Sequence, residues 1–287
     1  MRPPETLTPV QMQAFNDLSA IAINHSMFFI YYRTDKDVEE GAGGFPIRIG
    51  NRQFIITCHH VAKHFLGNPR VRFSFPVFVL DQDTQTKGGL LLVNEILHFK
   101  DALNEKIDLA VFEMNGIPDD RCTDISQLSL ERVGTHGFVA GQPGDLVEKN
   151  EDNPKRIDMT PNCTLVPEYP NFRVPFTDDF WSYFFEYPKY DYDLSGSEVK
   201  PSGLEVPSMQ GMSGSAIYSL DLNNPDPLNS KVLGVQQSQA EGIYFRAIPI
   251  GYALALIYGK YTNLPDPFGM YEQDKNGLRK YSWIPKD

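Results

Sequence analysis

Apolar residues near the N-terminus recur at the spacing of an α-helix. The positions that carry this pattern are Val10, Phe15, Leu18 and Ile21. They predict an amphipathic helix of about three turns within an N-terminal extension over residues 1–25, packed on the outside of the main body. Thr8 suits the N-cap and Pro9 the first helical position, so we expect the helix to begin there.

Beyond this extension the pattern changes to short alternating or β-branched runs separated by glycine turns. In the first half these runs lie at residues 27–32, 45–49, 53–57, 71–80, 89–93, 96–99 and 109–112. Many short strands without a long helical pattern between them are typical of an antiparallel sandwich or barrel. We therefore expect a first β-barrel over residues 26–130.

A second set of strand-like runs follows, at residues 137–141, 215–220, 232–237 and 242–250. It predicts a second β-barrel over residues 131–258 that ends in a short helix and carries a long insert at 145–207. A C-terminal tail follows at 259–287. The aromatic centre of the insert, residues 180–185, fits either an ordinary packed strand or the lining of a peptide-binding cleft.

Composition narrows the partners of this chain. A formal net charge of -11 argues against nucleic acid, because phosphate binding relies on clustered Lys and Arg. No apolar run approaches the roughly 18 residues needed to cross a bilayer, and the N-terminus lacks a signal-peptide pattern. The 3 cysteines are odd in number and widely spaced, unlike a secreted disulfide framework. We expect a cytoplasmic protein that binds neither nucleic acid nor membrane.

Three stretches that lie far apart in the chain supply a histidine, an aspartate and a serine. They are Thr57-Cys58-His59-His60-Val61, Lys106-Ile107-Asp108-Leu109-Ala110-Val111 and Gly211-Met212-Ser213-Gly214-Ser215. A serine hydroxyl is a poor nucleophile unless an imidazole takes its proton and a carboxylate fixes the tautomer of that imidazole. Each stretch alone is a weak signal, since strand-start aspartates and structural histidines are common. Their joint occurrence predicts a serine protease with the chain order His, Asp, Ser.

A metal centre is a weaker interpretation of the histidine-rich stretch. Cysteine and histidine side chains gather there at Cys58, His59, His60 and His64. Zinc sites need three or four ligands, usually from a second cluster at defined spacing, and the chain has no Cys-x-x-Cys or His-Glu-x-x-His. It has no phosphate-binding Gly-x-x-x-x-Gly-Lys loop either. We predict no metal and no cofactor.

The three stretches resemble those of the trypsin-like (chymotrypsin-fold) serine peptidases, closer to the bacterial quality-control type than to the digestive enzymes. Residues 57–62 are similar to the family's Thr-Ala-Ala-His-Val-Val, residues 108–111 to its Asp-Leu-Ala-Val, and residues 211–216 to its Gly-Asn-Ser-Gly-Gly-Pro. The resemblance spans about residues 27 to 258. It implies an all-β fold with two antiparallel six-stranded β-barrels of chymotrypsin type and the active site between them. Short helices are expected at both ends.

The resemblance also implies a role for each residue of the site. His60 would be the general base, Asp108 its orienting carboxylate and Ser213 the nucleophile. The amides of Gly211 and Ser213 would form the oxyanion hole. His59 is the competing candidate for the base, and we favour His60 because Val-Ala follows it.

The specificity pocket and the activation route depart from those of the digestive enzymes. The residues expected near the pocket are Pro207, Gln236, Ser238 and Gly242. No acid stands six residues before Ser213, so an apolar or small polar P1 residue is expected rather than Lys or Arg. Met212 replaces the acid that digestive members pair with a newly cut N-terminus, so that activation route is not expected here.

The expected function is a serine endopeptidase that works through an acyl-enzyme intermediate and acts on a specific intracellular protein. Its partner is a protein or peptide substrate. A latent enzyme that a regulatory protein activates is a further hypothesis, with the 145–207 insert as the restraint. The alternative is a catalytically silent module of the same fold that binds a protein partner.

Overall fold

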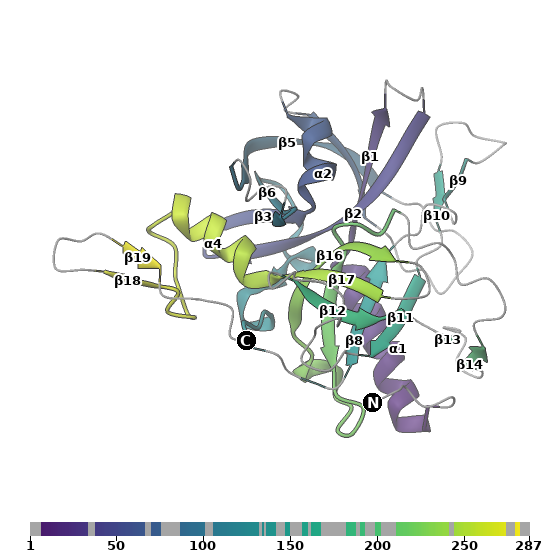
Figure 1. The fold of residues 1–287 in the computed structure, drawn as a ribbon. Helices are drawn as coiled ribbons and strands as arrows, with labels where there is room; N and C mark the ends of the chain where they lie inside the picture. Colours follow the sequence, from purple (N-terminus) through teal and green to yellow (C-terminus); the bar gives the residue numbers. More distant parts are fainter. Residues whose placement is uncertain are drawn as a thin grey trace.

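The structure is a computed structural model, and its strands form two stacked bodies, one built from each half of the chain (Figure 1). It describes residues 7–33, 38–66, 70–75, 87–100, 106–131, 134, 136–141, 147–149, 157–159, 162–167, 182–187, 190–192, 199–201, 211–240, 244–273 and 279–281. Two of the predicted pocket residues, Pro207 and Gly242, lie outside this described part.

The first half forms a closed barrel of six antiparallel strands. The strands are β1 (Met27–Arg33), β2 (Val38–Ile49), β3 (Arg52–Thr57), β4 (Arg70–Phe75), β5 (Lys87–His98) and β6 (Ala110–Met114). Their order is β1-β4-β5-β6-β3-β2, and the pairing of β1 with β2 closes the ring. The two-residue strand β7 (Thr123–Asp124) adds to β2 in parallel. We call this body the first barrel.

The second half forms a six-stranded antiparallel sheet, which we call the second barrel. Its strands are β8 (His136–Gly141), β11 (Asn162–Pro167), β12 (Tyr183–Glu186), β15 (Ala216–Leu220), β16 (Val232–Ala240) and β17 (Tyr244–Pro249). Their order is β11-β8-β15-β16-β17-β12. Every strand of the first barrel, and the strands β8, β15, β16 and β17 of the second, therefore overlap a predicted run, whereas β11 and β12 do not.

The stretch at 145–207, expected to be an insert, contributes strands to the second barrel. β11 and β12 both lie within it and pair with β8 and β17. Phe184 and Phe185 are almost fully buried, so the described part of the aromatic centre packs as an ordinary strand, and residues 180 and 181 lie outside the described residues. Two small hairpins also belong to the stretch, β9 (Val147–Lys149) with β10 (Ile157–Met159) and β13 (Tyr190–Tyr192) with β14 (Val199–Pro201). The remainder lies outside the described residues.

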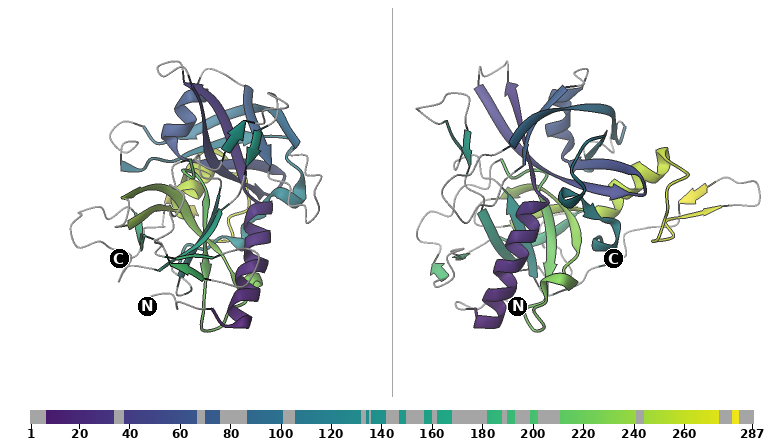
Figure 2. Two further views of the ribbon diagram at one scale, coloured as in Figure 1. Left: turned by 90° about the vertical axis from the view of Figure 1, so that its right-hand side faces the viewer. Right: turned by 180° about the vertical axis from the view of Figure 1, so that it is seen from behind.

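Helix α1 (Pro9–Asn24) packs along the outside of the second barrel, as the views from the side and from behind show (Figure 2). Thr8 is its N-cap and forms a capping box with Gln11, which confirms the predicted start. The ring of Phe15 meets that of Phe138 on β8 at a centroid distance of 5.3 Å. One member of the predicted apolar face differs: Val10 is 65% exposed. It lies in the first turn, before the helix reaches the sheet.

The remaining helices of the described residues are shorter than α1, and the longest of them follows β17. They are α2 (His59–Ala62), η1 (Lys63–Phe65), η2 (Asp119–Arg121), η3 (Ile125–Gln127), η6 (Pro227–Asn229) and α4 (Ile250–Lys260). α4 matches the short helix predicted near the C-terminal end. Within the described part of the chain, no helix is long and apolar enough to span a membrane.

A polar network joins the end of α4 to the first barrel. The Tyr261 hydroxyl lies 3.0 Å from a carboxylate oxygen of Glu113 and 3.0 Å from one of Glu95. The Arg52 guanidinium pairs with Glu113 and lies over the Tyr261 ring, and Lys260 pairs with Glu95 at 2.7 Å. Burial and the two carboxylates raise the pKa of Tyr261, so its hydroxyl keeps its proton as a donor. The network fixes α4 against strands β3, β5 and β6.

The predicted tail also contains structure that periodicity did not reveal. β18 (Tyr271–Gln273) and β19 (Arg279–Tyr281) form a hairpin that projects from the body beyond α4 (Figure 1). The Tyr271 hydroxyl donates to the Ala255 carbonyl on α4 at 2.9 Å, and the Tyr258 hydroxyl donates to the Pro265 carbonyl at 2.9 Å. These side-chain bonds hold the segment to the helix.

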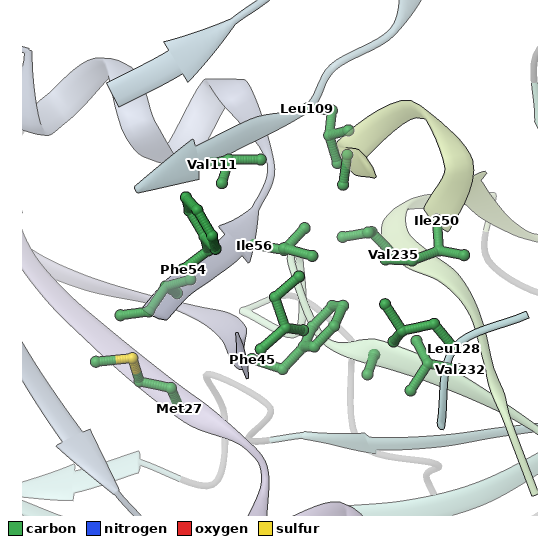
Figure 3. Packing of buried hydrophobic residues seen from close by; sticks show 14 of the residues in the cluster. Met27, Phe45, Phe54, Ile56, Leu109, Val111, Leu128, Val232, Val235 and Ile250 are labelled. Carbon is green, nitrogen blue, oxygen red and sulfur yellow. The ribbon is translucent and has the colours of Figure 1, made fainter. Parts of the chain in front are cut away.

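One apolar core runs from the first barrel into the second. Figure 3 shows Phe45, Ile56 and Leu109 of the first half in the same cluster as Val235 and Ile250 of the second. These side chains are fully buried. A core shared in this way holds the two barrels in a fixed relation, so side chains at their junction can form a defined site.

Candidate active site

His60 and Asp108 are in direct contact. The Nδ1 atom of His60 lies 2.5 Å from Oδ2 of Asp108, and the backbone N–H of His60 donates to Oδ1 of the same carboxylate at 2.8 Å. A carboxylate beside Nδ1 keeps the proton on that nitrogen and leaves Nε2 as an acceptor. The imidazole therefore has the tautomer and the fixed orientation that a general base requires.

Neighbouring strands bring this pair together. β3 ends at Thr57, and the short helix α2 begins at His59, so His60 lies in the first turn after the strand. Asp108 lies just before β6. β3 and β6 are antiparallel, with Thr57 opposite Ala110. The end of one strand and the start of the next therefore lie side by side, although 48 residues separate the two side chains in sequence.

The charge state of Asp108 follows from two opposing effects. Burial raises the pKa of its carboxyl group, because the charged form loses hydration. The hydrogen bond from the His60 ring, the charge of that ring, the His60 amide and a hydrogen bond from Gln237 together outweigh burial, and the pKa of Asp108 falls below its usual value. The carboxylate is thus ionised at neutral pH and can stabilise a positively charged imidazole.

The structure distinguishes the two adjacent histidines. His60 contacts the carboxylate, whereas the ring of His59 lies against the ring of His98 on β5, with centroids 5.0 Å apart. The two side chains leave α2 in different directions. Of the two histidines, His60 is therefore the one that contacts Asp108, and its role as general base stays a prediction.

Ser213 lies in a tight turn that glycine makes possible. The amide of Ser215 donates to the Met212 carbonyl at 2.9 Å, and Gly214 has a φ of 97°, the pattern of a type II β-turn with Ser213 at its second position. The Gly214 amide donates to the Gln236 carbonyl at 2.7 Å, and the Gly43 amide donates to the Ser213 carbonyl at 2.8 Å. The turn is therefore held by both barrels.

The buried side chain of Met212 anchors this turn in the second barrel. Its side chain is fully buried in an apolar cluster with Val139, Phe245 and Ala247 of the second barrel. Burying a methionine side chain contributes roughly 1.5–3 kcal/mol. The turn thus has an apolar anchor at the position where digestive enzymes place an acid, which the sequence alone did not reveal.

The two amides expected in the oxyanion hole, unlike the other amides of the turn, do not donate to its backbone hydrogen bonds. Gly211 has a φ of 94°, which a residue with a side chain adopts only with strain. The backbone bonds of the turn use the amides of Gly214 and Ser215. Within the described residues, the amides of Gly211 and Ser213 have no such partner, so both can donate to an incoming oxyanion.

Gln237 lies within the range 236–238 that was expected to form a wall of the pocket, and it also links the serine to the aspartate, which we did not predict. The Ser213 hydroxyl donates to the Gln237 carbonyl at 3.2 Å, and the Gln237 side-chain amide donates to Oδ2 of Asp108 at 3.4 Å. Gln237 is 7% exposed and lies in a bulge of β16, between the paired residues Gln236 and Ser238. Its signal in the sequence was its position directly after Gln236, a predicted pocket residue.

Of the four predicted pocket residues, the structure describes Gln236 and Ser238. Gln236 is buried, and its carbonyl accepts hydrogen bonds from the Gly214 amide and the Cys58 thiol, so its backbone supports the turn. Ser238 is partly exposed on β16. The pocket itself therefore stays a prediction.

The geometry gives a direct test of the turn. We expect Gly214→Ala to destabilise the protein strongly, because a side chain at this φ costs about 1–2 kcal/mol and its Cβ would lie 2.1 Å from the Gly43 carbonyl oxygen. Gly116→Ala is the matched control, since Gly116 has a φ of 88° and nothing within 4 Å of the added Cβ. Urea unfolding should show a clearly larger loss for Gly214→Ala, and equal losses would contradict the close approach.

Cys58, His60 and Asp108 also place three potential metal-ligating atoms within 4.8 Å of one another. The existing bonds do not suit a metal there. The His60 ring and the Asp108 carboxylate already bind each other, and the Cys58 thiol donates to the Gln236 carbonyl at 3.2 Å. Burial raises the pKa of the Cys58 thiol, which opposes the thiolate form that binds metals. None of the three cysteines forms a disulfide.

Comparison with known proteins identifies the fold. The crystal structure described as scabies mite inactivated protease paralogue S-D1 is 13% identical, covers 85% of this chain and 94% of its own, and has a TM-score of 0.50. A structure described as GrC is 10% identical, with coverages of 85% and 96% and a TM-score of 0.52. No family model and no curated protein sequence matches. The chain therefore has the all-β, two-barrel fold of chymotrypsin-like proteases.

Proposed function

We propose that the protein is a serine endopeptidase that hydrolyses peptide bonds through Ser213, His60 and Asp108. The observation that carries the proposal is the pair of contacts between His60 and Asp108, at 2.5 and 2.8 Å, beside a glycine-built turn that presents Ser213. An ionised carboxylate on Nδ1 of an imidazole near a turn-held hydroxyl is the arrangement that acyl transfer requires.

The proposed reaction assigns one step to each group. The Ser213 Oγ atom attacks the carbonyl carbon of the substrate and gives its proton to Nε2 of His60, while Asp108 stabilises the imidazolium that forms. The amides of Gly211 and Ser213 receive the developing oxyanion. His60 then gives the proton to the leaving amine as the C–N bond breaks. Water, activated by His60, hydrolyses the acyl-enzyme and restores the Ser213 hydroxyl.

A specific observation favours a second candidate, a silent module of this fold that binds a protein partner. The Ser213 hydroxyl donates to the Gln237 carbonyl, and a hydroxyl held there cannot at the same time donate to His60. One structural neighbour is described as an inactivated protease paralogue. In the enzyme proposal this hydrogen bond belongs to a resting state, and the Ser213 hydroxyl must leave the Gln237 carbonyl before it can donate to Nε2 of His60. A regulatory protein that activates a latent enzyme is part of the same proposal.

The proposals about partners and location rest on the sequence. The substrate is proposed to be a specific protein in the cytoplasm, with an apolar or small polar residue at P1. The quality-control type of peptidase remains the resemblance that the three motifs suggest.

Labelling with a fluorophosphonate probe tests whether Ser213 is a nucleophile. We expect the full chain to form a covalent adduct and peptide mapping to place it on Ser213. Ser213→Ala should abolish labelling. Ser215→Ala is the matched control, because Ser215 is the other serine of the turn and is 2% exposed; this variant should keep the adduct. A folded chain that no probe labels would favour the binding module.

A further inference from the structure

We infer that Gln237 and Arg246 of the second barrel form a clamp that positions Asp108 of the first barrel. The inference rests on the proposed function, in which each of the two is a positioning residue. Both side chains cross the junction between the barrels and donate hydrogen bonds to the segment that carries Asp108. The clamp thereby fixes the pair of His60 and Asp108 relative to Ser213, which belongs to the other barrel.

The first arm of the clamp is the side-chain amide of Gln237. It donates to Oδ2 of Asp108 at 3.4 Å, and the same oxygen lies 2.5 Å from Nδ1 of His60. Gln237 reaches this oxygen from the bulge in β16, between the paired residues Gln236 and Ser238. One carboxylate oxygen is therefore held by a side chain from each barrel.

The charge of Asp108 explains why a glutamine stands at this buried position. The Nε2 atom of Gln237 faces the carboxylate, whereas its Oε1 atom is buried and has no hydrogen-bond partner among the described residues. A buried acceptor without a donor costs free energy, and an apolar side chain of similar size would avoid that cost. The reversed amide would place Oε1 against an ionised carboxylate. The bond to Asp108 thus accounts for an amide that packing alone disfavours.

The second arm of the clamp is the guanidinium of Arg246 on β17. Its Nη2 atom donates to the Lys106 carbonyl at 3.4 Å, two residues before Asp108, and its Nε atom donates to the Ser182 hydroxyl at 2.8 Å. The planar fork of a guanidinium can hold two acceptors at once. Arg246 pairs across the sheet with Ser238, the residue that ends the bulge, so the two arms start side by side.

The first arm also supports the charge of Asp108. Burial raises the pKa of this carboxyl, and the groups that lower it belong to His60 and Gln237. Of these two described residues, Gln237 comes from the second barrel. The thiol of Cys58, the other ionisable group beside the pair, donates to the Gln236 carbonyl. Loss of the Gln237 amide therefore removes the support that the second barrel gives to the ionised carboxylate.

Peptide hydrolysis by the full chain tests the first arm, with circular dichroism to confirm the fold of each variant. Gln237→Met nearly keeps the size of the side chain and removes its donor. We expect kcat to fall about 10- to 100-fold, because Asp108 and His60 lose their exact orientation. KM should stay close to that of wild type, since the change does not remove a substrate contact.

Gln239→Met is the matched control for this variant. Gln239 lies on the same strand, and its Oε1 atom is likewise buried without a partner among the described residues. This variant should keep the wild-type kcat. Equal losses in the two variants would overturn the clamp. A raised KM with unchanged kcat in Gln237→Met would also overturn it, and would place Gln237 in the substrate pocket instead.

A double-mutant cycle tests whether the two arms act as one unit. Arg246→Met removes the second arm and should lower kcat about tenfold. In the double variant, the combined loss should differ from the product of the single losses, because both arms hold one segment. A combined loss that equals the product within about twofold would show two independent effects and contradict a clamp.

The pH dependence of thermal unfolding tests the first arm without catalysis. The ionised Asp108 stabilises the fold above the pKa of the unfolded chain, and this stabilisation is lost as the pH falls through the lower folded-state pKa. Gln237→Met should raise that folded-state pKa. The midpoint of wild type minus that of Gln237→Met should therefore decrease as the pH falls, whereas the corresponding difference for Gln239→Met should stay constant.

This readout separates the clamp from the proposed peptidase activity. A difference for Gln237→Met that does not change with pH would overturn the clamp, even in an active enzyme. A difference that decreases in acid, in a chain without peptidase activity, would keep the contact with Asp108 and overturn only the proposed function.

Discussion

Ser213→Ala is expected to lower the turnover of a fluorogenic peptide library by about 10⁶-fold, and His60→Ala is expected to cost about as much. The double variant should be no slower than either single one, because a nucleophile without a base, or a base without a nucleophile, leaves the same residual catalysis. The measurement is kcat at saturating peptide for wild type, the two single variants and the double variant.

The pattern of kcat values across wild type and the three variants distinguishes the peptidase from the silent binding module. Independent, multiplying losses would contradict a shared proton-transfer step between Ser213 and His60. Inactivity of all four proteins, each shown to be folded, would favour the silent binding module. Ser215→Ala is again the matched control, since it removes a buried hydroxyl from the same turn without touching the proposed proton path.

Local patterns predicted the architecture well because the strands are short and their faces are consistent. Alternation over 45–49 and 53–57 matches the hairpin of β2 and β3, where Ile49 pairs with Arg52 around a glycine turn. The N-cap at Thr8 was also visible in the sequence, since capping depends on residues three positions apart. Such features depend on near neighbours in the chain, so one sequence is enough to reveal them.

Contacts between distant segments were harder to predict. β11 and β12 were assigned to an insert because loop-like, proline-rich sequence surrounds them, and only their pairing with β8 and β17 shows that they belong to the sheet. Val10 fits the helical period of α1 but remains exposed, because it is not covered by the second barrel. A periodic pattern identifies the apolar face of a helix, but it does not show how much of that face the neighbouring sheet covers.

In the candidate site, too, local motifs were predictable from the sequence and contacts between distant segments were not. The motifs indicated His60, Asp108 and Ser213, and the structure brings the first two into contact. The link that Gln237 makes was not predicted, because it depends on a bulge in β16 that directs the Gln237 carbonyl and side chain toward two segments distant in sequence. The burial of Met212 was likewise invisible, because the cluster that receives it is assembled from separate strands.

Asp108→Asn is expected to lower kcat by about 10⁴-fold while leaving the fold nearly intact. The amide of asparagine has almost the shape of the carboxylate, and its oxygen can still accept the His60 backbone N–H. Its NH₂ group would then face Nδ1, which favours the tautomer with the proton on Nε2. In that tautomer His60 cannot accept the Ser213 proton. The measurement is kcat for the same peptide library, compared with wild type.

Stability as a function of pH provides the control for this variant. Because the pKa of Asp108 is lower in the folded state, the ionised carboxylate stabilises the protein above the pKa of the unfolded chain. That stabilisation is lost as the pH falls through the folded-state pKa. Wild type should therefore unfold at a higher temperature than Asp108→Asn near neutral pH, and the difference should shrink in acid. A variant that keeps near-normal kcat, despite this altered pH profile of unfolding, would remove Asp108 from the proposed mechanism and leave it a structural role in holding His60.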